Sequence, residues 1–78
     1  MPNLTPGTIV RDRREARGLS RERVARLADV STSLVTRLEL QNQIPKVVAL
    51  TRIATVLDIP LDELVAAIDA AEREAAAS

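Results

Sequence analysis

The stretch SRERVARLADVSTSLVTRLE, residues Ser20–Glu39, decides the fold of this chain. Apolar residues recur at three- and four-residue steps on both sides of a break at residues 29–31, which predicts two short helices joined by a sharp turn. Ser31 is a natural N-cap for the second helix, and Ala25 is small where two crossing helices must approach closely. The stretch therefore predicts a helix-turn-helix, with an expected apolar face of Val24, Ala25, Leu27, Ala28, Val30, Val35 and Leu38.

The second of these helices also carries a row of hydrogen-bonding side chains. Thr32, Ser33, Thr36 and Arg37 follow the N-cap directly, and a helix that only completed a core would not need them. Hydroxyl and guanidinium groups on an exposed helix are of the kinds that read base edges in the major groove of DNA. The same hydroxyls also fit ordinary polar surface, and Leu34 fits either the edge of the core or a contact with a thymine methyl group.

Length and composition limit the classes of function. The 78 residues fit one small domain, so a second domain is not expected. The chain has no cysteine and no histidine, which excludes disulfides, thiolate zinc sites and imidazole bases. Asp62 and Glu63 are adjacent and point in different directions on a helix. We therefore expect neither an enzyme nor a cofactor or metal site, and the lack of a long apolar run favours a soluble cytoplasmic protein.

The charged residues are distributed unevenly along a chain whose net charge is zero. Residues 1–40 contain eight basic against five acidic residues, whereas residues 41–78 contain three against six. The half with the helix-turn-helix is therefore basic and the other half acidic, which allows a local DNA footprint on a neutral protein. Five basic residues of the first half fit either a solvated helix face or phosphate contacts. They are Arg11, Arg13, Arg17, Arg23 and Arg26.

Three further helices are expected around this motif, with no strand. The first begins after the cap Thr5, runs from Pro6 to about Arg17 and stops at Gly18. Residues 40–45 form a loop, apolar spacing from residue 47 to 57 predicts a fourth helix, and Pro60 opens a fifth. The expected divisions are an N-terminal arm (1–5), the domain itself (6–68) and an alanine-rich helical tail (69–78) that frays near residues 75–78.

Four sequence features together resemble the lambda-repressor-like helix-turn-helix domains, the Cro/repressor or XRE type, over roughly residues 7–64. They are REARGLS at residues 14–20, the apolar pattern of residues 24–35, the pair Leu38-Glu39 six residues before Pro45, and IATVLDIPLDEL at residues 53–64. The resemblance implies an all-α, compact five-helix bundle. It also implies that the third helix, about Thr32–Leu38, enters the major groove and that the protein acts as a dimer.

The resemblance also implies roles for individual residues. It pairs Arg14 with Glu39 in a structural ion pair and assigns base reading to Thr32, Ser33, Thr36 and Arg37. Phosphate contacts are expected from Arg21 and Ser31, whereas Gln41, Asn42 and Gln43 fit either the formation of a turn or phosphate contacts. Three positions depart from the family pattern: Arg21 replaces a typical Gln, and Asp29 and Gln41 each replace a typical Gly. Arg21 is then expected to act as a charge, with an equal effect on all DNA sequences.

We therefore expect a sequence-specific repressor that binds a two-fold site on double-stranded DNA as a homodimer. Leu64, Val65 and Ile68 fit either the core or the dimer interface. The alternative is a protein-interaction module, such as an antitoxin or anti-repressor, that keeps the bundle and uses its acidic tail to bind a protein.

Overall fold

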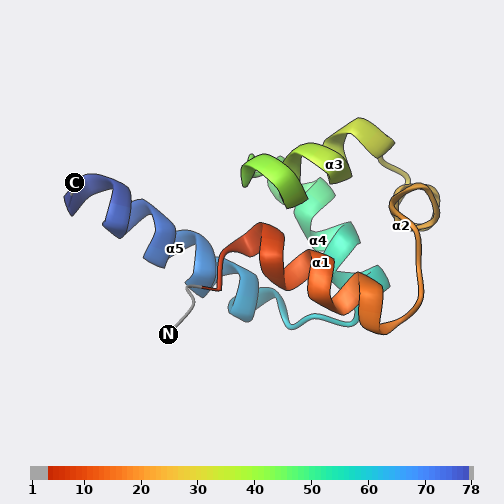
Figure 1. The fold of residues 1–78 in the computed structure, drawn as a ribbon, viewed down its shortest axis with the longest axis horizontal. Helices are drawn as coiled ribbons and strands as arrows, with labels where there is room; N and C mark the ends of the chain where they lie inside the picture. Colours follow the sequence, from red (N-terminus) through yellow and green to blue (C-terminus); the bar gives the residue numbers. More distant parts are fainter. Residues whose placement is uncertain (1–3, 78) are drawn as a thin grey trace.

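The computed structural model describes residues 4–77, which form five helices and no strand. These are α1 (Pro6–Ala16), α2 (Arg21–Ala28), α3 (Thr32–Gln41), α4 (Val47–Leu57) and α5 (Leu61–Ala77). Figure 1 shows α1 in front of α4, with α3 across one side of the bundle and α2 at one end. The second half of α5 projects away from the other helices. The all-α fold class and the five-helix architecture are as the sequence predicts.

Side-chain caps fix the starts of the first three helices. The hydroxyls of Thr5, Ser20 and Ser31 accept hydrogen bonds from the backbone N–H three residues further on. Each cap satisfies one of the N–H groups that a helix start leaves without a partner. The predicted caps Thr5 and Ser31 are therefore confirmed, Ser20 is a third cap of the same kind, and Ser31 sets the point where α3 begins.

Three of the helices end in the same way. Gly18, Asp29 and Asp58 adopt left-handed backbone conformations after α1, α2 and α4, with φ of 67°, 57° and 54°. The residue after each donates its N–H to a carbonyl five residues back. This turn directs the next apolar side chain, of Leu19, Val30 or Ile59, toward the core. Asp29 thus performs the turn for which the family typically uses glycine.

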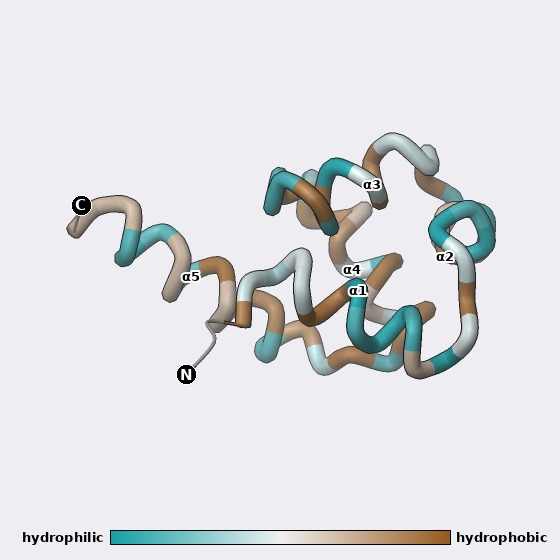
Figure 2. The backbone as a smooth tube through the Cα atoms, viewed as in Figure 1, coloured by the Kyte–Doolittle hydropathy of each residue, from teal (hydrophilic) through white to brown (hydrophobic). Residues whose placement is uncertain are grey.

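The core lies where α1, α2, α3 and α4 meet, and the first turns of α5 close it. Figure 2 shows apolar segments concentrated where these helices face one another. The buried apolar side chains are those of Val10, Val24, Ala25, Ala28, Val35, Leu38, Leu50, Ile53, Ala54, Leu57, Ile59 and Leu64. Burial of this apolar surface is the main source of stability for a domain of this size.

Several sequence predictions need correction. Leu27 and Val47 were expected in apolar faces, but their side chains are 49% and 75% exposed. They lie at helical positions next to the buried stripes, and spacing alone does not locate the edge of a stripe. Helix α3 runs to Gln41, so the loop begins at residue 42 instead of 40. Helix α5 extends to Ala77, and the expected fraying near residue 75 stays a prediction, while Ser78 and residues 1–3 of the expected arm lie outside the described residues.

Candidate nucleic-acid interface

Helix α3 divides lengthwise into an inner and an outer face. Val35, Leu38 and Glu39 are buried on the inner face, against α1 and α2. The outer face is exposed at helical spacing through Ser33, Arg37, Leu40 and Gln41. Thr32, Leu34 and Thr36 lie half-buried along its edges. Two of the four expected base readers, Ser33 and Arg37, thus stand fully on the open face, and the other two border it.

Arg37 is the outer-face residue with the strongest recognition chemistry. Its side chain is exposed and makes no hydrogen bond or ion pair with any residue in the range 4–77. A guanidinium presents several N–H donors in a planar fork that matches the two acceptors of guanine in the major groove. Its donors are therefore available to a partner outside the described chain.

The inner face of α3 is held by an ion network around Glu39. Arg14 of α1 donates from Nε to Oε2 at 2.7 Å and from Nη2 to Oε1 at 3.0 Å, the bidentate geometry that charged forks favour. Its Nη1 donates to the Leu19 carbonyl at 2.8 Å. The hydrogen bonds that Arg14 donates to Glu39 raise the pKa of Arg14 above its ordinary value. The structure thus brings together the two residues expected to form an ion pair, and the Glu39 side chain is 0% exposed.

A second arginine joins this network, which the sequence did not indicate. Arg21, the first residue of α2, donates from Nε to Oε1 of Glu39 at 3.0 Å. Glu39 therefore accepts three hydrogen bonds from two arginines, and among residues 4–77 no buried side-chain nitrogen or oxygen lacks a partner. The phosphate contact expected of Arg21 stays a prediction; its side chain is 33% exposed and reaches from the buried carboxylate of Glu39 to the surface.

The C-terminal end of α3 is fixed by a close contact with the start of α1. The N–H of Gly7 donates to Oδ1 of Asn42 at 2.9 Å, and a Cβ atom at residue 7 would lie only 2.3 Å from the Leu38 carbonyl oxygen. Asn42 itself has φ of 52°, a conformation that asparagine tolerates. Gln41 stays helical, so the glycine that the family places there is not needed, because the left-handed turn falls one residue later.

The remaining expected phosphate contacts lie around the two ends of α3. Ser31 is exposed, and its oxygen accepts from the N–H of Leu34, which leaves its own proton to donate. Gln41, Asn42 and Gln43 are all exposed at the opposite end. The amide group of Asn42 uses its oxygen for Gly7, so its nitrogen remains a donor. These four residues therefore lie at the two ends of α3, with Ser31 at its start and the other three at its C-terminal end.

The chain matches the model of the family described as "Helix-turn-helix domain" over residues 7–68. It belongs to the helix-turn-helix domain family. The match is consistent with the lambda-repressor-like DNA-binding type that the sequence features resemble. Such domains bind DNA and are typically not enzymes. Comparison with curated protein sequences finds no match.

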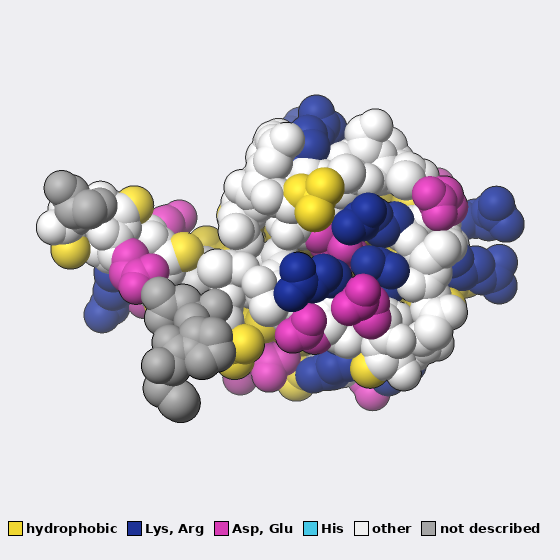
Figure 3. All heavy atoms as spheres, viewed as in Figure 1, with side chains coloured by type: hydrophobic (Ala, Val, Ile, Leu, Met, Phe, Trp, Pro, Cys, Tyr) yellow, Lys and Arg dark blue, Asp and Glu magenta, His cyan; other side chains and the backbone are white. Residues whose placement is uncertain are grey.

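In this helix-turn-helix domain the basic residues separate into two groups. Arg11, Arg13 and Arg17 form ion pairs with Asp12, Glu63 and Asp58, at 3.5, 3.7 and 3.5 Å. Figure 3 shows basic and acidic side chains side by side over the α1 face. The basic side chains of residues 4–77 that make no ion pair lie on α2, α3, α4 and the segment before α4, and are Arg23, Arg26, Arg37, Lys46 and Arg52. The α1 side is thus largely neutralised, and uncompensated positive charge lies elsewhere.

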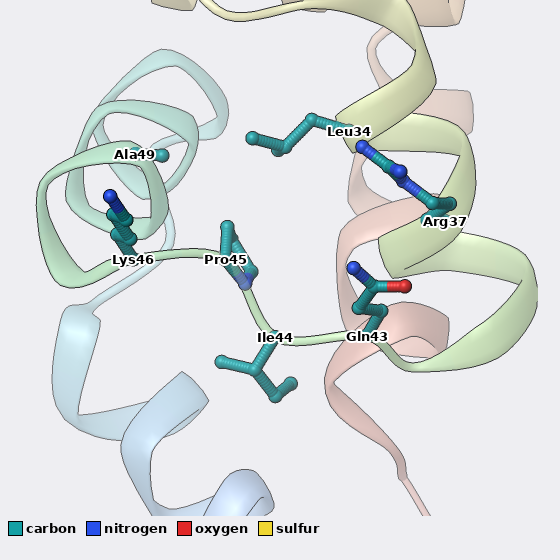
Figure 4. Close-up of a pocket in the computed structure, with 7 residues that line it drawn as sticks. All are labelled: Leu34, Arg37, Gln43, Ile44, Pro45, Lys46 and Ala49. Atoms are coloured by element: carbon teal, nitrogen blue, oxygen red, sulfur yellow. The ribbon is translucent and has the colours of Figure 1, made fainter.

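An open hollow of about 310 Å³ adjoins the outer face of α3. In Figure 4, Leu34 and Arg37 extend from α3 on one side, and Gln43, Pro45 and Lys46 lie on the segment that leads into α4. Lys46 occupies the N-cap of α4, where it makes no side-chain hydrogen bond to the helix. Sequence analysis missed Lys46. Two features of the sequence point to Lys46. It directly follows the loop, and no acidic residue lies between Glu39 and Asp58.

The expected dimer-interface residues do not share one environment. Leu64 is 0% exposed and belongs to the core, which is the first of the two alternatives expected for it. Ile68 is half-buried and packs against the core, whereas Val65 is 51% exposed. The three residues lie on α5 within one turn of each other, but only the Val65 side chain points largely into solvent.

None of the helices in residues 4–77 is both long and apolar enough to cross a membrane. No group of three or more Asp or Glu side chains among these residues is placed to hold a metal ion.

Proposed function

We propose that this domain is a sequence-specific transcriptional repressor that binds a two-fold site on double-stranded DNA as a homodimer. The observation that carries the proposal is the exposed outer face of α3, on a helix whose inner face is held by a buried ion network. On this outer face Arg37 lies beside Ser33 and has no side-chain partner among residues 4–77. A rigid helix with open donors keeps its hydrogen bonds aligned with base edges, which sequence-specific readout requires.

Base reading is assigned to Ser33 and Arg37 on the open face and to Thr32 and Thr36 at its edges. Phosphate contacts are assigned to Arg21, at the start of α2, to Ser31, at the start of α3, and to Gln41, Asn42 and Gln43 around the end of α3. We add Lys46, because its ammonium lies beside the same hollow as Arg37 and has no acidic partner among the described residues.

Selection of bound duplexes from a random pool tests the proposal directly. We expect one enriched motif with two-fold symmetry, its half-sites about 10 base pairs apart or a multiple of that, as two copies of α3 in successive major grooves require. Enrichment of a single half-site would contradict the homodimer. Flow-through on a DNA column at low salt would contradict DNA binding altogether and favour the alternative of a protein-interaction module.

A further inference from the structure

Arg21 connects the surface of the domain to the buried side of α3. Its Nε donates to Oε1 of Glu39 at 3.0 Å, and both carboxylate oxygens of Glu39 are also bonded to Arg14. Because the Glu39 side chain is fully buried and belongs to α3, a displacement of the Arg21 guanidinium acts on the helix that presents the base readers.

The two edges of the Arg21 guanidinium face different surroundings. The Nε donates to Glu39, whereas neither Nη group donates a hydrogen bond to any of residues 4–77. The network of two guanidinium groups and one carboxylate also carries a surplus positive charge. An anion can therefore bind the Nη groups without breaking the bond to Glu39.

We propose that Arg21 is a positioning residue for base reading: a DNA phosphate bound by its Nη groups fixes α3 through the Nε bond to Glu39. The inference rests on the proposed function, which supplies the phosphate. It differs from the expectation drawn from sequence, in which Arg21 is a charge that strengthens binding to all DNA sequences equally. Here the loss of Arg21 also reduces the discrimination between sequences.

Lysine at this position separates the two roles. It keeps the positive charge, but its donors radiate from a single nitrogen, so it cannot hold a carboxylate and a phosphate on opposite edges of one rigid plane. Arg23 offers the matched control, because it lies two residues further along α2, is exposed and has no partner among the described residues.

The experiment measures affinity for the duplex selected from the random pool and for a scrambled duplex of equal length and composition. Wild type, Arg21→Lys, Arg21→Ala and Arg23→Ala are compared over a range of salt concentrations, with thermal unfolding recorded for each. We expect Arg21→Lys to leave the salt slope unchanged and to lower the ratio of the two affinities about tenfold. Arg21→Ala lowers the ratio similarly and also reduces the slope by about one. Arg23→Ala leaves the ratio unchanged.

A wild-type ratio in Arg21→Lys, or an equal loss on both duplexes in Arg21→Ala, overturns the positioning role and leaves the proposed function standing. A fall in the ratio for Arg23→Ala as large as that for Arg21→Lys also overturns it, since any arginine of α2 would then have the effect. Failure of the wild-type domain to retain any duplex overturns the proposed function itself, and the positioning role with it.

Discussion

Two arginines on opposite sides of α3 have opposite surroundings: one is buried and bonded, and the other is exposed. On the inner side, the Arg14 guanidinium is 11% exposed and uses Nε, Nη1 and Nη2 within the fold. On the outer side, the Arg37 guanidinium is exposed and uses none within the described chain. The first arginine fixes where the helix lies, and the second is available for binding. Sequence-specific recognition needs both, because free donors read DNA only if the helix that carries them does not move.

The largest effect is expected from removing the acidic centre of the inner face. Glu39→Ala leaves the guanidinium of Arg14 buried without its carboxylate, and Arg21 loses its partner as well. Breaking a buried ion pair on one side costs about 3–5 kcal/mol of unfolding free energy, a large part of the stability of a small domain. Chemical denaturation of wild type and variant measures the loss.

Asp69→Ala is the matched control for this variant, since it removes a carboxylate from the exposed ion pair with Arg73. The change in unfolding free energy should stay below about 0.5 kcal/mol. A loss of less than about 1 kcal/mol in Glu39→Ala would show that apolar packing alone holds α3.

The next effect concerns the contact between the start of α1 and the end of α3. In Gly7→Ala the added Cβ would lie 2.3 Å from the Leu38 carbonyl oxygen and 2.9 Å from that of Glu39, so the two helices must separate. We expect a net destabilisation of about 1–3 kcal/mol by thermal or chemical unfolding, despite the higher helix propensity of alanine.

Gly18→Ala provides the contrast, because a Cβ there meets no atom within 4 Å and only the left-handed backbone, with φ of 67°, opposes it. The expected cost is about 1–2 kcal/mol from backbone strain alone, and α3 should keep its place. Gly7→Ala should therefore lower affinity for the selected duplex in the folded protein, whereas Gly18→Ala should not. Equal DNA affinity in the two folded variants would contradict a positioning effect of the Gly7 contact.

Local residue patterns predicted the helices well, because each cap acts within four residues of itself. Thr5, Ser20 and Ser31 are recognisable as caps from their neighbours, and Gly18 and Asp29 as helix ends. Spacing was less reliable for Leu27 and Val47, since a short helix has apolar residues next to its buried stripe as well as in it.

The long-range contacts could not be predicted from spacing. Arg21 and Glu39 are 18 residues apart, and Gly7 and Asn42 are 35 apart, so only the packing of α1 and α2 on α3 brings them together. The pairing of Arg14 with Glu39 was implied by the family resemblance, and no local pattern indicated it. The same limit applies to the charges: the sequence lists the basic residues, but only the fold separates those paired on α1 from those left open.

A change on the outer face should affect DNA binding and leave stability intact. Arg37→Ala removes an exposed side chain with no partner in the described chain, so unfolding free energy should change by less than about 0.5 kcal/mol. Affinity for the selected duplex should fall about tenfold or more, because a bidentate contact with guanine contributes about 1–3 kcal/mol of discrimination. Binding to duplexes with single base changes locates the position that is read, and an equal loss on every duplex would remove Arg37 from the base readers.

The smallest effect is expected on stability, from substitutions at two residues that have a left-handed backbone conformation, one before and one after α3. Asp29, before α3, and Asn42, after it, have nearly the same backbone, with φ of 57° and 52°. The Asp29 side chain makes no hydrogen bond with residues 4–77, whereas the Asn42 side chain accepts the N–H of buried Gly7. Glycine removes the strain at both positions, but only Asn42→Gly leaves a buried donor without its partner.

We therefore expect Asp29→Gly to be neutral or slightly stabilising and Asn42→Gly to be about 1 kcal/mol less stable than Asp29→Gly, as measured by chemical denaturation. Because the backbone term is shared, the difference between the two variants isolates the single hydrogen bond that joins α1 to the end of α3. Indistinguishable stabilities would mean that water replaces the asparagine oxygen without loss. The close approach of the helix backbones at Gly7 would then be the feature that fixes the C-terminal end of α3.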